Sequence, residues 1–156
     1  MLYIGNLVNT HGIKGEVRII SNFKYKDLIF KPDTYLYIND EKLKIKTYRK
    51  HKNYDMVTFE GYHDINEVLK FKGCKVYINK DDFNFPGPLN EDLYGKKVYN
   101  NGKYIGTLKE IINNGGGELL VVNGKKEYLI PYVDEFVKNI DENIELNLIK
   151  GFIDED

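Results

Sequence analysis

The fold is decided by a short stretch near the N-terminus, Thr10-His11-Gly12-Ile13-Lys14-Gly15-Glu16-Val17-Arg18. Apolar and polar residues alternate after its second glycine, as they do in a strand with one buried face. Gly12 and Gly15 permit the sharp backbone turn that joins two strands. The Gly-x-x-Gly spacing also occurs in the clamp of KH RNA-binding domains, but that clamp joins two helices. We therefore interpret the stretch as a turn between strands, with Gly12 and Gly15 as structural turn residues.

Further strand patterns follow in the first half of the chain. Leu43, Ile45 and Thr47 fall on one side of a predicted strand, and Asn39-Asp40 before it is typical of a turn. The opposite side of that strand carries Lys42, Lys44, Lys46, Tyr48 and Lys50. The sequence therefore predicts a half-buried sheet with a lysine-rich strand.

One short helix interrupts the strands. Asp64-Ile65-Asn66-Glu67 has the form of a capping box, in which the first carboxylate accepts from an amide of the first turn. Gly73 is well placed to end the helical segment in a left-handed conformation. A helix over 64–69 followed by a strand over 74–78 is expected.

The segment Pro86-Gly87-Pro88 marks a boundary, because its prolines fix φ and remove two backbone donors. We predict a first domain over 1–82, a linker over 83–91 and a second domain over 92–156.

The second half contains two Asn-Gly pairs, Asn101-Gly102 and Asn123-Gly124, each between apolar runs. Each pair predicts a tight hairpin turn, and a closing strand is expected over 144–149. Many short strands with evenly spaced turns indicate a mainly β protein of two small β-barrels with short helices.

Charge is unevenly distributed between the two halves. Residues 1–82 contain 15 Lys and Arg against 11 Asp and Glu, a net charge of +4, whereas residues 83–156 contain 8 against 13, a net charge of −5. The first half therefore suits an anionic partner and the second half suits a different one. Chance variation of surface charge is the alternative.

Hydropathy and cysteine content indicate the expected location of the protein in the cell. No apolar run approaches the ~20 residues that a membrane-spanning helix needs, and the N-terminus lacks the pattern of a signal peptide. A cytoplasmic protein without a membrane partner is expected. The single cysteine, Cys74, excludes an internal disulfide.

Residues for catalysis or metal binding do not form a recognisable pattern. His11, His51 and His63 are isolated, and Ser21 is not in a Gly-x-Ser-x-Gly elbow. The glycines at 115–117 lack the Lys-Ser/Thr that completes a phosphate loop. We therefore expect no metal, no cofactor and no catalytic residues.

Two basic segments in the first half are candidates for nucleic-acid binding. The first contributes His11, Lys14 and Arg18, and the second contributes Lys44, Lys46, Tyr48, Arg49, His51 and Lys52. Lysines along a strand can follow phosphates, and Tyr48 can stack on a base. The alternative is a solvated edge strand whose lysines discourage aggregation.

The motifs together resemble the RimM family. Ile4-Gly5 followed by residues 8–18 is similar to the family's N-terminal motif, and Asp92-Leu93-Tyr94-Gly95, Leu119–Val122 and Leu129-Ile130-Pro131 are similar to its C-terminal PRC-barrel. The resemblance covers nearly the whole chain.

The resemblance implies a translation-factor-like N-terminal barrel, a C-terminal PRC-barrel and a non-catalytic assembly role. The partners it implies are the small ribosomal subunit precursor, a small-subunit head protein (the nineteenth in the usual naming) and small-subunit ribosomal RNA. It further implies support of head maturation and ribosomal RNA processing. A monomer is expected. The protein-binding residues expected in the second half are Leu89, Tyr94, Glu118 and Tyr132.

Two positions depart from the family pattern. The family has an aromatic pair just before its Asp-Leu-x-Gly, a pair tied to ribosome binding, and this chain has Pro88-Leu89 there. A family loop that often ends in Asn-Asp reads Gly117-Glu118 here. Leu89 can supply apolar contact but cannot stack as an aromatic ring does.

Two other functions remain open at this point. A generic RNA-binding barrel protein needs only the basic segments. An RNA-processing enzyme needs a cluster of carboxylates that the fold brings together, with three or more acidic side chains in one pocket.

Overall fold

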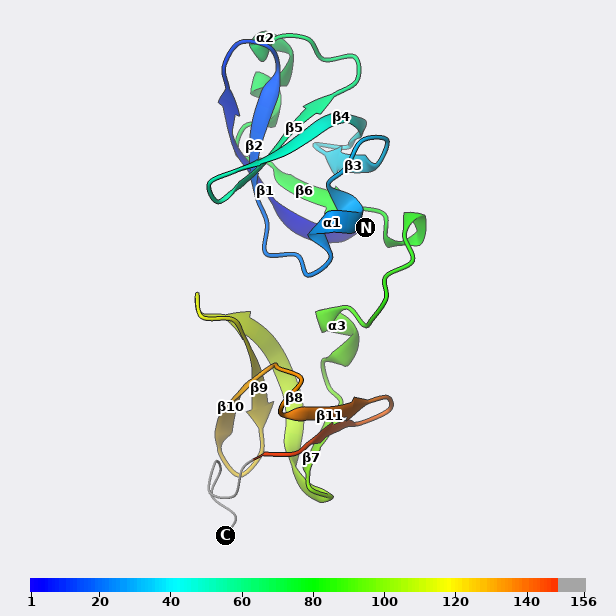
Figure 1. Ribbon diagram of the computed structural model, residues 1–156, viewed down its shortest axis with the longest axis vertical. Helices are drawn as coiled ribbons and strands as arrows, with labels where there is room; N and C mark the ends of the chain where they lie inside the picture. Colours follow the sequence, from blue (N-terminus) through cyan, green and yellow to red (C-terminus); the bar gives the residue numbers. More distant parts are fainter. Residues whose placement is uncertain (149–156) are drawn as a thin grey trace. The chain divides into compact units, whose positions relative to one another are not determined.

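The computed structural model describes residues 1–148, and the chain forms two compact units, Met1–Pro86 and Gly87 onward (Figure 1). Both units consist mainly of strands, with helices of a single turn, which confirms the predicted mainly β class. Phe83 and Phe85 lie in the predicted linker, yet both pack against the core of the first unit. The Phe85 ring stacks on that of Tyr25, with the ring centroids 5.1 Å apart.

Six strands of the first unit close into a barrel in the order β1-β2-β5-β4-β3-β6, and every neighbouring pair is antiparallel. The strands are β1 Leu2–His11, β2 Glu16–Ile20, β3 Tyr35–Ile38, β4 Glu41–His51, β5 Tyr54–Phe59 and β6 Lys75–Ile78. The short helices are α1 Lys26–Ile29, α2 Ile65–Val68 and the 3₁₀ turns Leu69–Phe71 and Lys80–Asp82.

Local sequence signals account for the turns of this barrel. Residues 12–15 join β1 to β2, as predicted, and no helix flanks them. Asn39 and Asp40 adopt φ angles of 51° and 63° in the tight β3–β4 hairpin. The Asp64 side chain accepts from the backbone amides of Asn66 and Glu67, so it caps α2 as the capping box predicts.

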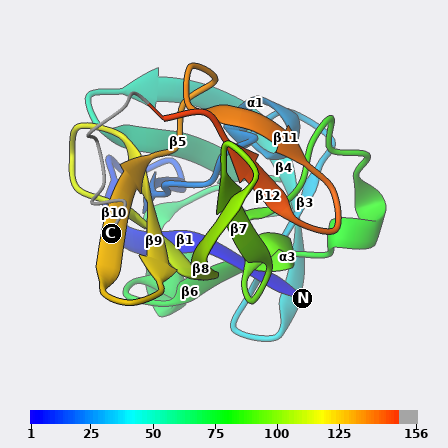
Figure 2. The same cartoon turned by 90° about the horizontal axis from the view of Figure 1, so that it is seen from below.

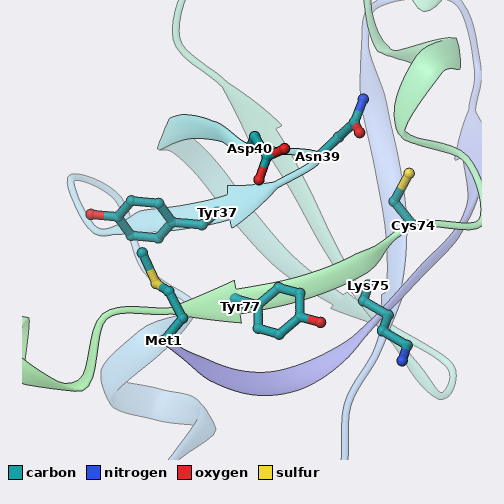
Figure 3. A pocket seen from close by; sticks show the side chains of 7 residues that line it. All are labelled: Met1, Tyr37, Asn39, Asp40, Cys74, Lys75 and Tyr77. Carbon is teal, nitrogen blue, oxygen red and sulfur yellow. The ribbon is translucent and has the colours of Figure 1, made fainter.

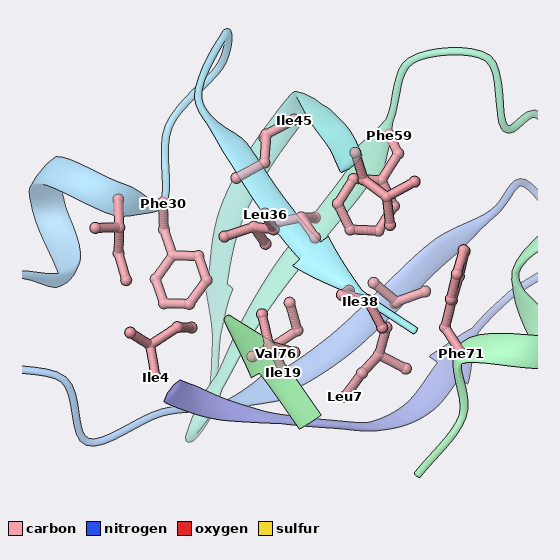
Figure 4. Close-up of a cluster of buried hydrophobic side chains, with 14 of the residues drawn as sticks. Ile4, Leu7, Ile19, Phe30, Leu36, Ile38, Ile45, Phe59, Phe71 and Val76 are labelled. Carbon is pink, nitrogen blue, oxygen red and sulfur yellow. The ribbon is translucent and has the colours of Figure 1, made fainter. Parts of the chain in front are cut away.

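The core of the barrel is formed by the inward-facing residues of all six strands, together with residues of the short helical segments (Figure 4). It includes Leu7, Ile19, Leu36, Ile45, Phe59 and Phe71, all with no exposed surface. Alternation of side chains along each strand places the neighbours of these residues on the outside. The outer faces are therefore where polar side chains from separate strands meet.

A charged network lies between β4, β5 and α1. Asp55 has no exposed surface, and its carboxylate lies 2.6 Å from Lys26 Nζ of α1. The Tyr48 hydroxyl donates to Asp55 Oδ1 at 2.7 Å, and the Tyr48 ring stacks on Phe30 with centroids 6.0 Å apart. Burial raises the pKa of Tyr48, and the hydrogen bond to Asp55 raises it further. These contacts give Tyr48 a packing role.

A β-bulge in β4 makes one sequence-based expectation wrong. The register with β5 shifts between Ile45 and Thr47, so Thr47 is exposed rather than aligned with the buried Leu43 and Ile45. Beyond the bulge Tyr48 lies opposite the buried Val57. Tyr48 therefore does not share an outer face with the lysines of the first part of β4.

The second unit contains one six-stranded sheet in the order β10-β9-β8-β7-β12-β11, which can be followed in Figure 2. The strands are β7 Lys97–Asn100, β8 Lys103–Asn113, β9 Glu118–Asn123, β10 Glu127–Pro131, β11 Val137–Ile140 and β12 Ile144–Leu146, and the helix is α3 Asn90–Leu93. β12 pairs in parallel with β7, and the other pairs are antiparallel. Its core contains Leu93, Val98, Leu108, Leu120, Val122 and Ile130.

The two Asn-Gly pairs behave differently. Asn101 and Gly102 adopt φ angles of 51° and 85° between β7 and β8, as a tight turn requires. Asn123, by contrast, still pairs with Glu127, so the β9–β10 turn spans residues 124–126 and is not centred on the Asn-Gly pair. A Cβ at Gly124 would collide with the Ile105 carbonyl oxygen, so this glycine allows β8 to approach closely. The closing strand predicted over 144–149 is β12, and residue 149 lies outside the described range.

Tyr48→Phe is expected to lower the free energy of unfolding by about 1–3 kcal/mol, because it removes a hydrogen bond to the buried Asp55 carboxylate. Urea unfolding followed by circular dichroism measures the change. The matched control is Tyr104→Phe, whose ring is 51% exposed and which should stay within about 0.5 kcal/mol of the parent protein. Equal stability of the two variants would contradict the role assigned to Tyr48.

Candidate functional site

Side chains from four strands meet on the outer face of the first barrel. We call this group the outer cluster; it consists of His11, Glu16, Arg18, Arg49, His51 and Tyr54. The pairing of strands explains the grouping, since His11 lies opposite Glu16 and His51 lies opposite Tyr54. The barrel thus brings the two predicted basic segments together at this end of β1 and β4.

A two-pronged ion pair connects β2 to β4 within the outer cluster. Arg49 donates through Nε and Nη2 to the two carboxylate oxygens of Glu16, at 2.8 and 2.7 Å. The hydrogen bond from Arg49 holds the pKa of Glu16 below its usual value of 4.5, although partial burial opposes the shift. Glu16 in turn raises the pKa of Arg49. This pair fixes the plane of the Arg49 guanidinium.

Arg18 is fixed by different partners. Its Nη2 donates to His11 Nδ1 at 2.7 Å, and because a guanidinium only donates, that ring nitrogen is the acceptor. The guanidinium carbon lies 5.4 Å from the centroid of the Tyr54 ring, a cation–π arrangement. Arg18 Nε is buried and has no hydrogen-bond partner in the described part of the chain. The hydrogen bond to His11 and the Tyr54 ring therefore hold the Arg18 guanidinium in place.

Met56 forms the apolar floor of the cluster. It pairs in register with Arg18 on one side and with Arg49 on the other, and none of its surface is exposed. Val57 beside it faces the barrel core, so Met56 faces outward and is covered by side chains of the outer face. The aliphatic parts of arginine side chains are well suited to cover an apolar residue.

Two turns at the same end carry further lysines. The rings of His11 and His51 lie 6.1 Å apart, which brings together the end of β1 and the end of β4, and Lys14 and Lys52 lie in the turns that follow these strands. Both lysines are exposed. The predicted residues His11, Arg18, Arg49 and His51 therefore lie together in the outer cluster, and Lys14 and Lys52 lie in the turns next to it.

The geometry of the β1–β2 turn depends on its glycines. Gly12 and Gly15 have φ angles of 69° and 90°, which favour glycine. The Ile13 carbonyl accepts from the Ile65 amide at 2.9 Å, so the turn is held against the start of α2. A Cβ at Gly15 would lie 3.1 Å from the Tyr62 carbonyl oxygen, which is tight. The glycines thus set the backbone geometry of the turn that carries Lys14.

The remaining lysines of the predicted strip lie elsewhere. Lys44 precedes the bulge of β4 and Lys46 lies in it, away from the end that carries the outer cluster. Lys44 Nζ is 3.6 Å from Asp33, and Lys46 is exposed. The structure therefore divides the strip into two parts.

The residues predicted for protein binding surround α3 in the second unit. Asn90 of α3 donates to the Glu118 carboxylate at 2.6 Å, and the Tyr132 amide donates to the Glu118 carbonyl at 2.9 Å. The Tyr94 hydroxyl accepts from the Ile111 amide at 3.2 Å, while its ring remains 41% exposed. Leu89 is only 7% exposed, which leaves little of it to offer a partner.

The residues predicted for the site did not include three residues of the outer cluster and its floor, namely Glu16, Tyr54 and Met56. Glu16 lies in the quoted motif, but its partner Arg49 is 33 positions away and nothing local links them. The alternation over 56–60 could have indicated that Met56 faces outward, but its burial depends on side chains from two other strands.

Residues 1–148 contain neither a cluster of metal-ligating side chains nor a membrane-spanning helix. No group of three or more His, Cys, Asp or Glu side chains in that range is placed to hold a metal ion. No helix there is long and apolar enough to cross a membrane.

Both halves of the chain match domains of the same protein family. Residues 2–83 match the RimM N-terminal domain and residues 90–151 match the RimM PRC barrel domain. The Staphylococcus haemolyticus ribosome maturation factor RimM is 38% identical, covering 97% of this chain and 98% of that protein. The protein of that name from Streptococcus thermophilus is 36% identical, covering 98% of this chain and 97% of that protein.

Among solved structures, the chain is similar to a Pseudomonas aeruginosa protein described as a putative 16S ribosomal RNA processing protein RimM. That protein is 22% identical, with a TM-score of 0.46, and the match covers 95% of this chain and 97% of the other. The family matches confirm the expected N-terminal RimM-type domain and C-terminal PRC barrel. Since both domain models match and the relatives align over nearly their whole length, the chain belongs to the RimM family.

Proposed function

We propose that this protein is a non-catalytic assembly factor that binds immature small ribosomal subunits in the cytoplasm. In this role it supports maturation of the subunit head and processing of small-subunit ribosomal RNA. The observation that carries the proposal is the match of both domains to the RimM family, whose relatives are named ribosome maturation factors. The outer cluster then supplies a surface suited to RNA.

The outer cluster is suited to RNA because its cations are arranged in two ways. Arg18 and Arg49 are held by protein partners, so their planar groups are preorganised. Lys14 and Lys52 are exposed on the adjoining turns and can neutralise phosphates without losing a structural contact. We infer that the lysines provide most of the salt-dependent affinity and that the arginines orient the RNA.

The second unit suits a different partner. Residues 83–156 carry a net charge of −5, which complements a basic ribosomal protein such as the nineteenth protein of the small subunit. Tyr94 and Val133 expose apolar surface there, at 41% and 42%. We infer that Tyr94, Glu118 and Tyr132 lie at this protein contact and that the factor acts as a monomer.

The exposed lysines of the two turns can be tested by substitution. Lys14→Gln with Lys52→Asn should weaken binding to immature small subunits, and the salt slope should fall by about one per lost phosphate contact. Asparagine is chosen because Lys52 has a φ of 55°. Co-sedimentation with immature and mature subunits over a series of salt concentrations measures both quantities.

The matched control is Lys109→Gln with Lys138→Gln, which makes the same change of charge at exposed positions of the second unit. It should leave the salt dependence of binding to immature small subunits unchanged. Equal effects of the two double variants would show that the surface around the outer cluster does not contact RNA. Equal binding of the parent protein to immature and mature subunits would contradict an assembly-specific role.

A second variant tests the other part of the lysine strip. If Lys44 and Lys46 also meet phosphates, as we propose, Lys44→Ala with Lys46→Ala should lower the salt slope by about two. The same co-sedimentation series provides the measurement. Unchanged affinity and slope would confine the RNA contact to the outer cluster.

The lowered pKa of Glu16 predicts a stability difference that depends on pH. A carboxylate with a lowered pKa stabilises the fold above its usual value of 4.5, and this contribution disappears as the pH falls through the folded-state pKa. Glu16→Gln should therefore be slightly less stable than the parent protein at neutral pH, because the Arg49 side chain is half exposed and screened. In thermal unfolding the difference should shrink as the pH falls below 4.5 and vanish below the folded-state pKa of Glu16, and a difference independent of pH would contradict this account.

A further inference from the structure

A row of tyrosines crosses the outer face of the barrel on the wall opposite the β2–β5 pair. Tyr3 of β1 lies opposite Tyr77 of β6, and Tyr77 lies opposite Tyr37 of β3. Residues directly opposite each other in antiparallel strands project from the same face. Val76 and Ile78 on either side of Tyr77 are buried in the core, so the three tyrosines face outward. We call them the tyrosine row.

The tyrosine row borders an open groove of about 670 Å³, which is within the range of ligand sites. Figure 3 shows the Tyr37 and Tyr77 side chains over the neighbouring strands β3 and β6, with Met1 beside them. Cys74, Lys75 and the Asn39-Asp40 turn complete the lining. The Tyr3 and Tyr77 rings meet edge to face with centroids 5.9 Å apart, and Tyr3 is 48% exposed. Aromatic surface is therefore offered across three adjacent strands.

Two lysines accompany the tyrosine row. Lys42 lies opposite Tyr37 and holds its Nζ 4.3 Å from the centroid of the neighbouring Tyr35 ring. Lys75 Nζ lies 5.7 Å from the centroid of Tyr3. Within residues 1–148, neither lysine has a carboxylate within 4.0 Å, whereas Glu41 nearby is paired with Lys70. Among residues 1–148, Asp40 is the one acidic residue that lines the groove.

We propose that the tyrosine row binds an unpaired RNA strand, with bases stacked on Tyr37 and Tyr77 and phosphates at Lys42 and Lys75. Aromatic side chains stack on any exposed base, and cations beside them follow the backbone, which together make a single-strand platform. Paired RNA hides its base faces within the helix and is recognised mainly through its backbone. The row therefore distinguishes unpaired from paired RNA, in contrast to the phosphate contacts of the outer cluster.

This site is separate from the outer cluster and does not depend on it. In the barrel order β1-β2-β5-β4-β3-β6, the outer cluster is centred on β2 and β5, and the tyrosine row is centred on β6 and β3. The two sites share only β1 and β4, and they use different parts of these strands. One barrel can then hold two RNA segments at once.

The test uses the full chain and a fluorescently labelled unpaired RNA of about ten nucleotides, with a hairpin duplex for comparison. The parent protein should bind the unpaired RNA more tightly than the duplex. Tyr37→Leu with Tyr77→Leu should weaken the binding of unpaired RNA at least about tenfold, because stacking on two rings is lost. Tyr37→Phe with Tyr77→Phe keeps both rings and should bind as the parent protein does.

The matched control is Tyr99→Leu with Tyr104→Leu, which removes another edge-to-face pair, with centroids 5.7 Å apart, from the second unit. It should leave RNA binding unchanged. Lys42→Ala with Lys75→Ala leaves all tyrosines in place and should reduce the salt slope for the unpaired RNA by about one per lysine. Circular dichroism establishes that each variant is folded.

Several outcomes would overturn the proposal. These are equal affinity of the parent protein for unpaired and duplex RNA, unchanged binding by the leucine variant, an equal loss in the control, or a salt slope unaffected by the lysine changes. Loss of subunit binding by the leucine variant with unchanged RNA binding would assign the row to a protein contact instead. Failure of the Lys14 and Lys52 variant to affect subunit binding bears only on the outer cluster, so the two proposals are tested apart.

Discussion

β1 is hydrogen-bonded along both edges, to β2 on one side and to β6 on the other, and this double pairing closes the first barrel. Each pairing contains a shift of register, between Leu7 and Asn9 toward β2 and between Tyr3 and Gly5 toward β6. Such bulges increase the twist and bend of a strand, as closure requires. A Cβ at Gly5 would collide with the Ile20 carbonyl oxygen, so only glycine lets β1 and β2 meet here.

Closure has a direct consequence for the surface. A closed barrel directs one side of every strand into a single core, and the other side of every strand must then face outward. Residues far apart in the sequence become neighbours on that outer face, as Glu16 does with Arg49 and Tyr37 with Tyr77. Both proposed RNA contacts are products of strand order rather than of any continuous motif.

The sequence was informative where a feature depends on neighbouring residues. The Asn39-Asp40 and Asn101-Gly102 turns, the cap at Asp64 and the strand-to-strand turn at residues 12–15 were all predicted from local chemistry. The basic residues near His11 and Arg49 were also identified, because their types are evident in the sequence.

Features that depend on the pairing of distant strands were not predictable in the same way. The bulge between Ile45 and Thr47 reverses the alternation of β4, and no residue there marks it. Tyr48 was for that reason placed on the wrong face, whereas the structure turns it toward Asp55 and Phe30. The tight turn predicted at Asn123-Gly124 was wrong, because β9 continues through Asn123.

The spacing of the two proposed sites limits how RNA can bind. Tyr3 and His11 lie on the same strand, and a rise of about 3.3 Å per residue separates them by about 25 Å along β1. They also face different walls of the barrel, so a compact RNA element cannot occupy both. The outer cluster offers fixed arginines and free lysines, which favour the phosphates of folded RNA, whereas the tyrosine row requires bases that are not yet paired. With both proposed contacts, the factor would bind folded and unpaired RNA together and would lose the second contact once those bases pair.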